Sequence, residues 1–172
     1  MLYHFSENPT IKEFIPLENQ NKEMPPAVWA IDEEHAVHYF FPRDCPRVIY
    51  TRSANMSEED VKLFFSHTLA NKVIAVETAW MERIKSTTIY KYTFLHEGFL
   101  LFDQTAGYYI THSPVQPISI EPMGDLLEKI TEKGVELRIT PNLYPLRDAI
   151  ISSSVDDFSI IRFRNAQKPT NY

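Results

Sequence analysis

Short runs of β-branched and aromatic residues alternate with helix-start signals along this chain, and this alternation limits the fold more than any other feature. Residues of these types are enriched in strands. The runs occupy residues 2–6, 28–31, 47–51, 72–76, 88–95, 99–102, 108–112, 135–139 and 158–163. Strands placed before, between and after helices are typical of an α+β domain. We therefore predict an α+β fold with a twisted mixed or antiparallel sheet and about three to four flanking helices.

The helix-start signals lie between these runs. Asp32 predicts a helix over 32–41, and the capping-box-like sequence at 57–60 predicts another through about Ala70. Helical spacing assigns the buried face of the second helix to Val61, Phe64, Phe65 and Leu69. Further helices are predicted over 78–85, 125–133 and 143–151, and a hairpin is predicted to join 88–95 to 99–102 through a turn at 96–98.

A chain of 172 residues fits one domain. We predict a single α+β domain over 1–166 and a flexible tail over 167–172. The polar segment 19–26 ends in two prolines, which indicates an exposed loop and a mobile flap.

Composition excludes several classes of function. The chain has only 4 glycines and no Gly-rich phosphate loop, and its formal charge of −6 disfavours binding to duplex nucleic acid. A single cysteine fits a reducing compartment, and we find neither a signal peptide nor an apolar stretch of the roughly 18 residues that a membrane helix needs. These observations predict a cytoplasmic protein without a membrane partner.

The first fifty residues hold most of the groups able to carry chemistry. His4 lies on the opening strand, where it is either a core histidine or a ligand-binding one. His35 and His38 are three residues apart, and with Cys45 or His4 they would supply zinc ligands. Cys45 itself is either a thiol activated by neighbouring arginines or a small buried hydrophobe.

Two arginines and a later acidic segment are further candidates. Arg43 and Arg47 lie on a proline-stiffened loop, where guanidinium groups bind carboxylate or phosphate, or else form surface ion pairs. Glu77 ends an apolar strand and is a candidate general acid or base, or else a residue that caps the next turn. Trp80 would stack on a base or sugar, or else pack in the core.

Two resemblances follow from these segments. Leu2-Tyr3-His4-Phe5-Ser6, Ala27-Val28-Trp29-Ala30, the segment 41–47 and Pro145-Leu146-Arg147-Asp148-Ala149 resemble a family of short uncharacterised bacterial proteins over nearly the whole chain. More distantly, Tyr3-His4-Phe5-Ser6 and 28–39 resemble the ADP-ribosyltransferase and RNA 2′-phosphotransferase-like folds over the N-terminal quarter.

The second resemblance implies a split mixed sheet that binds NAD or another nucleotide. His4 and Ser6 would contact the ribose side, Trp29 would line the site, and Tyr39 would stack near the nicotinamide. A late acidic residue would orient the substrate, and Glu77, Glu97 and Glu121 all compete for that role.

Three functions are therefore expected from the sequence. The first is an NAD- or nucleotide-binding enzyme of ADP-ribosyltransferase-like type, with Glu77 and Tyr39 in catalysis. The second is a non-catalytic protein in which His4, Arg43, Arg47 and Trp80 hold a small anion or nucleotide. The third is a metal-dependent hydrolase built on His35, His38 and Cys45.

Overall fold

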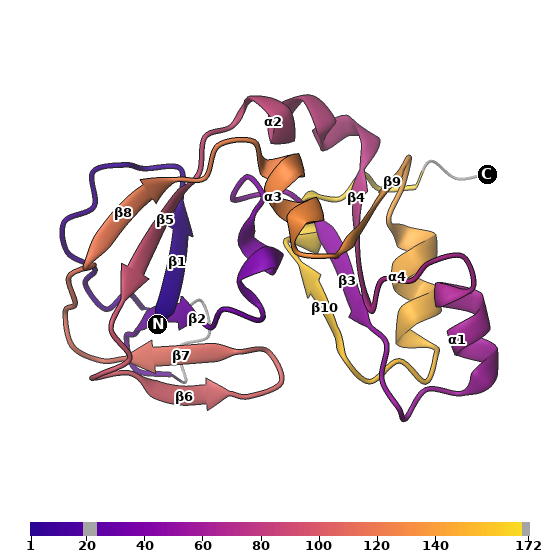
Figure 1. Ribbon diagram of the computed structural model, residues 1–172, viewed down its shortest axis with the longest axis horizontal. Coiled ribbons are helices and arrows are strands. Elements are labelled where there is room, and N and C mark those ends of the chain that lie inside the picture. Colours follow the sequence, from indigo (N-terminus) through magenta and orange to yellow (C-terminus); the bar gives the residue numbers. More distant parts are fainter. Residues whose placement is uncertain (19–23, 170–172) are drawn as a thin grey trace. The chain divides into compact units, whose positions relative to one another are not determined.

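The computed structural model describes residues 1–18 and 24–169, which fold into two compact units (Figure 1). Unit 1 comprises Met1–Phe40 and Thr87–Gly124, and unit 2 comprises Phe41–Ser86 and Asp125–Tyr172. Each unit contains its own sheet, and the helices lie in unit 2 except for one 3-10 turn in unit 1. The predicted α+β class is confirmed. The predicted domain boundaries, one domain over 1–166 with a tail over 167–172, stay a prediction.

Unit 1 contains an antiparallel sheet with the strand order β6-β7-β2-β1-β5-β8 (Figure 1). Its strands are β1 (Leu2–Ser6), β2 (Val28–Ile31), β5 (Tyr90–Phe94), β6 (Leu100–Asp103), β7 (Tyr108–Thr111) and β8 (Ser119–Pro122). The central strands are rich in β-branched and aromatic residues, which pack well on a pleated surface.

One face of this sheet carries the core of unit 1. Tyr3 pairs with Ile31, so alternation places Leu2, Val28 and Phe94 together on the opposite face. Phe14, from the loop after β1, packs its ring against Tyr92 and Phe94 with centroid separations of 5.1 Å each. The segment after β1 therefore covers the core face.

Unit 2 contains a mixed sheet with the order β10-β3-β4-β9, in which β4 and β9 are parallel. Its strands are β3 (Arg47–Thr51), β4 (Lys72–Glu77), β9 (Glu136–Thr140) and β10 (Phe158–Ile161). Its helices are α1 (Glu58–Phe65), α2 (Met81–Ser86), α3 (Leu126–Glu132) and α4 (Tyr144–Ile151). Short 3-10 turns occur at Thr78–Trp80 and Phe163–Asn165.

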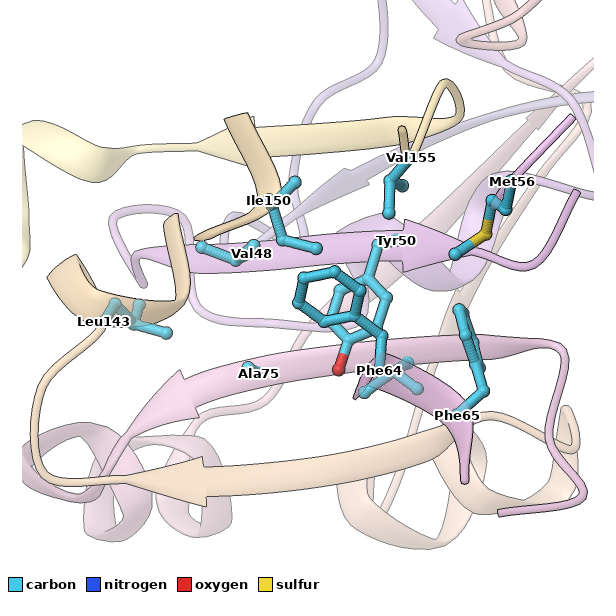
Figure 2. Close-up of a cluster of buried hydrophobic side chains, with 10 residues drawn as sticks. Val48, Tyr50, Met56, Phe64, Phe65, Ala75, Leu143, Ile150 and Val155 are labelled. Carbon is cyan, nitrogen blue, oxygen red and sulfur yellow. The ribbon is translucent and has the colours of Figure 1, made fainter. Parts of the chain in front are cut away.

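The core of unit 2 surrounds Tyr50, whose side chain is fully buried (Figure 2). The ring lies edge-on to Phe64 and Phe65, at centroid separations of 5.7 and 5.4 Å. Its hydroxyl accepts a hydrogen bond of 2.8 Å from the guanidinium of Arg138. A tyrosine is tolerated here because this bond satisfies its only polar group.

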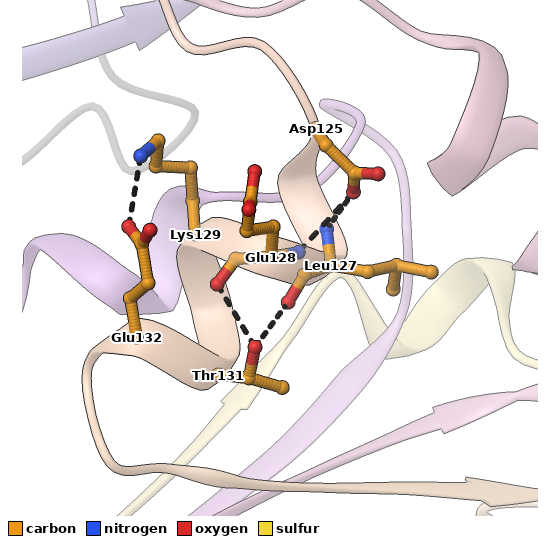
Figure 3. A network of polar contacts seen from close by, with 6 residues as sticks. All are labelled: Asp125, Leu127, Glu128, Lys129, Thr131 and Glu132. Atoms are coloured by element: carbon orange, nitrogen blue, oxygen red, sulfur yellow. Dashed lines mark hydrogen bonds and ion pairs between the residues drawn. The ribbon is translucent and has the colours of Figure 1, made fainter.

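Two of the predicted helix starts are capped by local side chains. Ser57 Oγ accepts a hydrogen bond of 3.1 Å from the amide of Asp60, which begins α1. Asp125 accepts bonds from the amides of Leu127 and Glu128 at the start of α3 (Figure 3). The exposed helix ends are thus satisfied by local side chains.

Three local predictions are wrong. The helix predicted over 32–41 is reduced to a 3-10 turn, Ala36–Tyr39, although the Asp32 carboxylate accepts the amide of His35 as a helix cap would. Helix α1 ends at Phe65, and Leu69 is fully exposed rather than buried. In both places the helical segment is shorter than the apolar pattern predicts.

The third wrong prediction is the hairpin that was expected to join 88–95 to 99–102. Strand β5 pairs with β1 and β8, whereas β6 pairs with β7. Phe99 is buried at the turn after β5, so the chain enters the core there and does not return alongside β5. Strand β8 was not predicted. Of the predicted flap at 19–26, residues 19–23 lie outside the described part of the chain.

Gly107 tests how tightly the two turns of unit 1 pack. A Cβ atom at Gly107 would lie 2.3 Å from His35 Nδ1, whereas one at Gly98 meets nothing within 4 Å, although both have positive φ (+69° and +83°). We expect Gly98→Ala to lower the free energy of unfolding by about 1 kcal/mol, from backbone strain alone. Gly107→Ala should cost at least about 1 kcal/mol more, because the turn and His35 must separate. Urea unfolding of the two variants measures the difference, and equal losses would show that the contact is easily relieved.

Candidate ligand-binding site

The structure divides the predicted site residues between the two units. His4, Ser6, Trp29 and Tyr39 lie in unit 1, whereas Arg43, Arg47, Glu77 and Trp80 lie in unit 2. Each group is therefore described within its own unit.

His4 and Trp29 are joined through the backbone but project from opposite faces of the sheet. The ring nitrogen His4 Nδ1 donates to the carbonyl oxygen of Trp29 over 3.0 Å, and the imidazole lies 4.9 Å from the Phe14 ring on the core face. The register places His4 opposite Ala30, so Trp29 points to the other face. Ser6 Oγ accepts from the amide of Asn8 in the turn after β1. His4 and Ser6 thus have structural partners of their own.

Four aromatic side chains gather on the face that carries Trp29, and we call Trp29, Tyr39, Phe102 and Tyr108 the aromatic cluster. The Trp29 ring lies edge-on to Phe102 and Tyr108, at centroid separations of 4.9 and 5.7 Å. The hydroxyls of Tyr39 and Tyr108 are 2.5 Å apart. Trp29, Tyr39 and Tyr108 are half-buried and Phe102 is exposed. Strands β2, β6 and β7 and the 3-10 turn thus present one continuous set of rings.

The cluster depends on the pairing of Asp32 and His35. Asp32 Oδ1 accepts from both the amide and the ring Nδ1 of His35, at 2.9 and 2.8 Å, and the amide of Asp32 donates to the carbonyl of Gly107 over 3.0 Å. The bond between the Asp32 amide and the Gly107 carbonyl ties the turn at 32–35 to the turn just before Tyr108. The 3-10 turn that follows His35 then brings Tyr39 to Tyr108.

The metal hypothesis finds little geometric support. His35 and His38 are in ring contact, with centroids 5.5 Å apart, but Asp32 occupies Nδ1 of His35. In the described ranges no three His, Cys, Asp or Glu side chains gather in an arrangement suited to a metal ion. Cys45 belongs to the other unit.

In unit 2, Glu77 holds two segments of chain together. Its side chain is buried, with 1% of the residue exposed. The carboxylate accepts from the amide of Leu143 over 3.2 Å and from the amide of Gln167 over 3.1 and 3.0 Å. These bonds join the end of β4 to the start of α4 and to the segment after the last 3-10 turn. The geometry is that of a structural acceptor rather than of a general acid or base.

Arg47 and Cys45 are also buried. The guanidinium of Arg47 donates to the carbonyl of Cys45 over 2.7 Å and lies 5.2 Å from the centroid of the Phe41 ring. Burial raises the pKa of the Cys45 thiol to about 12, and the nearby positive charge of Arg47 only partly opposes this. The thiol is therefore a small buried hydrophobe, and the alternative of an activated nucleophile is not supported.

The remaining predicted residues lie at the surface of unit 2. Arg43 is exposed, and Trp80 is half-buried with the guanidinium of Arg83 5.2 Å from its ring centroid. The sequence did not predict that Tyr108 and Phe102 lie beside Trp29, because only the pairing of β7 with β2 and β6 brings their rings together.

These observations define a two-unit α+β protein whose distinctive surface is an aromatic cluster rather than an acid–base centre. The model of DUF6886, a family of unknown function, matches residues 3–166, so the chain belongs to that family. No curated protein and no solved structure matches this chain. Nothing in these comparisons supports the ADP-ribosyltransferase-like resemblance. Among the described helices, none is both long and apolar enough to cross a membrane.

Glu77→Gln separates the structural role from a catalytic one. The substitution keeps the shape but removes the charge and one acceptor, so we expect it to lower the free energy of unfolding by about 1.5–3 kcal/mol. Glu82→Gln is the matched control, because Glu82 makes only an exposed ion pair with Lys85, and we expect a change below about 0.5 kcal/mol. Chemical unfolding measures both, and an unchanged stability for Glu77→Gln would contradict the structural role.

The raised pKa of Cys45 predicts slow thiol labelling. The folded pKa of about 12 lies above the ordinary value of 9.0, so the native thiol stays protonated at pH 8. We expect an aromatic disulfide reagent at pH 8 to label native protein at least about a hundredfold more slowly than urea-unfolded protein. Because folding raises the pKa of this thiol, burying it in its protonated form adds to the free energy of unfolding below pH 9. This contribution is lost as the pH rises toward 12. Rapid labelling of native protein would overturn this assignment.

Proposed function

We propose that this protein binds a nucleotide, with NAD as the first ligand to test, by stacking the ligand's planar ring on the aromatic cluster. The observation that supports the proposal is the continuous ring contact of Trp29, Tyr108 and Tyr39 on one face of the unit 1 sheet. Stacking of a base on an aromatic side chain contributes about 1–3 kcal/mol. Half-buried rings are suited to it, because they are fixed by their neighbours and still present surface.

A binding role without a catalytic step is favoured by the state of the candidate catalytic groups. The carboxylate of Glu77 is engaged by backbone amides, and the Cys45 thiol is protonated at neutral pH. Tyr39 shares a hydrogen bond with Tyr108. These arrangements fix the groups in place and favour the second sequence hypothesis over the first.

The small-anion form of that hypothesis has weaker support. Arg47 is buried against Phe41 and bonded to a carbonyl oxygen, and Arg43 is exposed. An anion site would therefore rest on the surface arginines of unit 2. Phosphate and citrate are suitable probes for it beside the nucleotides.

ADP-ribosyl transfer is the second candidate. In its favour, β1 and β2 are neighbours in one sheet, and His4 and Tyr39 lie in the same unit, as the resemblance requires. Against it, that sheet is antiparallel, whereas the resemblance implies a split mixed sheet. Release of free nicotinamide from NAD by the purified protein, above the rate of a Tyr39→Phe variant, would support transfer.

Substitution of the two tryptophans tests the binding proposal. Calorimetric titration with NAD and AMP should show binding that Trp29→Leu weakens at least about tenfold, because a stacked ring is lost. Trp80→Leu is the matched control, since Trp80 is also half-buried but lies in unit 2. Absence of binding to every nucleotide, or equal losses in the two variants, would contradict the proposal.

A further inference from the structure

The charges of the chain are divided unevenly between the two units. Unit 1 carries ten acidic residues, three lysines and no arginine, a formal charge of −7, whereas all eight arginines lie in unit 2. The aromatic cluster belongs entirely to unit 1. A strongly negative unit attracts a cationic ring, such as the nicotinamide ring of oxidised NAD, and disfavours the phosphates of the same ligand.

Two carboxylates lie on either side of Tyr108. Asp103 is its partner across the β6–β7 pair, and Asp32 directly follows Ile31, its partner across the β2–β7 pair. Asp103 accepts a hydrogen bond from the amide of Ala106 and is exposed. Asp32 is bonded to the imidazole of His35. Tyr108 thus has one acidic residue, Asp103, as its direct cross-strand neighbour and a second, Asp32, one residue beyond its other partner.

The same face of the sheet already holds one cation on a ring. Lys91 Nζ lies 5.7 Å from the centroid of Tyr3 and forms an ion pair of 3.1 Å with Glu121. Tyr3 also donates to Glu33, and burial together with these two carboxylates raises the pKa of Tyr3 to about 12. An aromatic ring beside carboxylates accommodates an ammonium group here, which shows the type of recognition that the cluster offers.

We propose that the aromatic cluster selects an organic cation, in particular an N-alkylated heteroaromatic ring or a quaternary ammonium group, over the neutral ring of the same shape. This inference rests on the proposed function and specifies the charge of the ring that stacks on Trp29. A cation over an aromatic face is stabilised by the ring quadrupole, most strongly by tryptophan. The surrounding carboxylates add an attraction that falls with ionic strength.

A pair of small ligands isolates the charge. 1-Methylnicotinamide and nicotinamide have nearly the same planar ring, but only the first carries a fixed positive charge. We expect the full-length protein to bind the cation about tenfold more tightly in calorimetric titration at low salt. The preference should shrink to about threefold when the salt concentration rises from about 50 to about 500 mM.

Variants locate the site. Trp29→Leu should remove most of the preference, and Trp80→Leu should retain it. Asp103→Asn keeps an acceptor for the amide of Ala106 and removes one charge, so we expect it to reduce the preference about twofold to threefold. Glu97→Gln makes the same change of net charge in the turn before Phe99, and we expect no change in preference. If Trp29→Leu fails to fold, the two charge variants still decide the question.

The outcomes separate this inference from the proposed function. Equal affinity for the charged and the neutral ring, with NAD still bound through Trp29, would overturn the inference and leave the proposed function standing. A cation preference that survives both Asp103→Asn and Trp29→Leu would place the cation-binding site outside the aromatic cluster. That result would overturn the inference as well. No binding of NAD, AMP or either nicotinamide ring would overturn both.

Discussion

The pairing of Asp32 with His35 is the interaction on which the surface of unit 1 depends. One carboxylate oxygen accepts both the amide and the ring nitrogen of His35 and fixes the turn that leads into the 3-10 segment Ala36–Tyr39. The amide of the same aspartate holds the turn before β7 through Gly107. The hydrogen bond between Tyr39 and Tyr108 follows from this geometry, so a short polar motif positions aromatic rings that lie far apart in the sequence.

Unit 2 uses a buried carboxylate in a related way. Glu77 ends β4 and accepts amides from two segments that follow much later in the chain. A carboxylate buried in this manner is stable because its charge is met by several donors, and breaking one of them leaves an unsatisfied group. In both units an acidic residue at the end of a β-strand or directly after it serves to fix backbone. An acidic residue at a strand end is therefore insufficient evidence for acid–base chemistry.

Local sequence signals predicted the positions of strands and helices better than they predicted which strands pair. The strands over 47–51 and 72–77 and the caps at Ser57 and Asp125 follow from residue type and spacing within a few positions. The hairpin at 96–98 failed because strand pairing depends on where Phe99 is buried, which no local window contains. The site was limited in the same way: Trp29 and Tyr39 were identified, but their contacts with Tyr108 and Phe102 arise from pairing between distant strands.

The charge division changes what the net charge of the chain implies. A formal charge of −6 suggests uniform repulsion of phosphates, yet it is the sum of −7 in unit 1 and +1 in unit 2. Repulsion of nucleic acid is therefore a property of unit 1, whereas the arginines of unit 2 are distributed among thirteen acidic residues. Electrostatic recognition depends on the charges within about a Debye length of the ligand, roughly 8–10 Å at physiological salt. The charges around each candidate site, rather than those of the whole chain, decide which ligand it attracts.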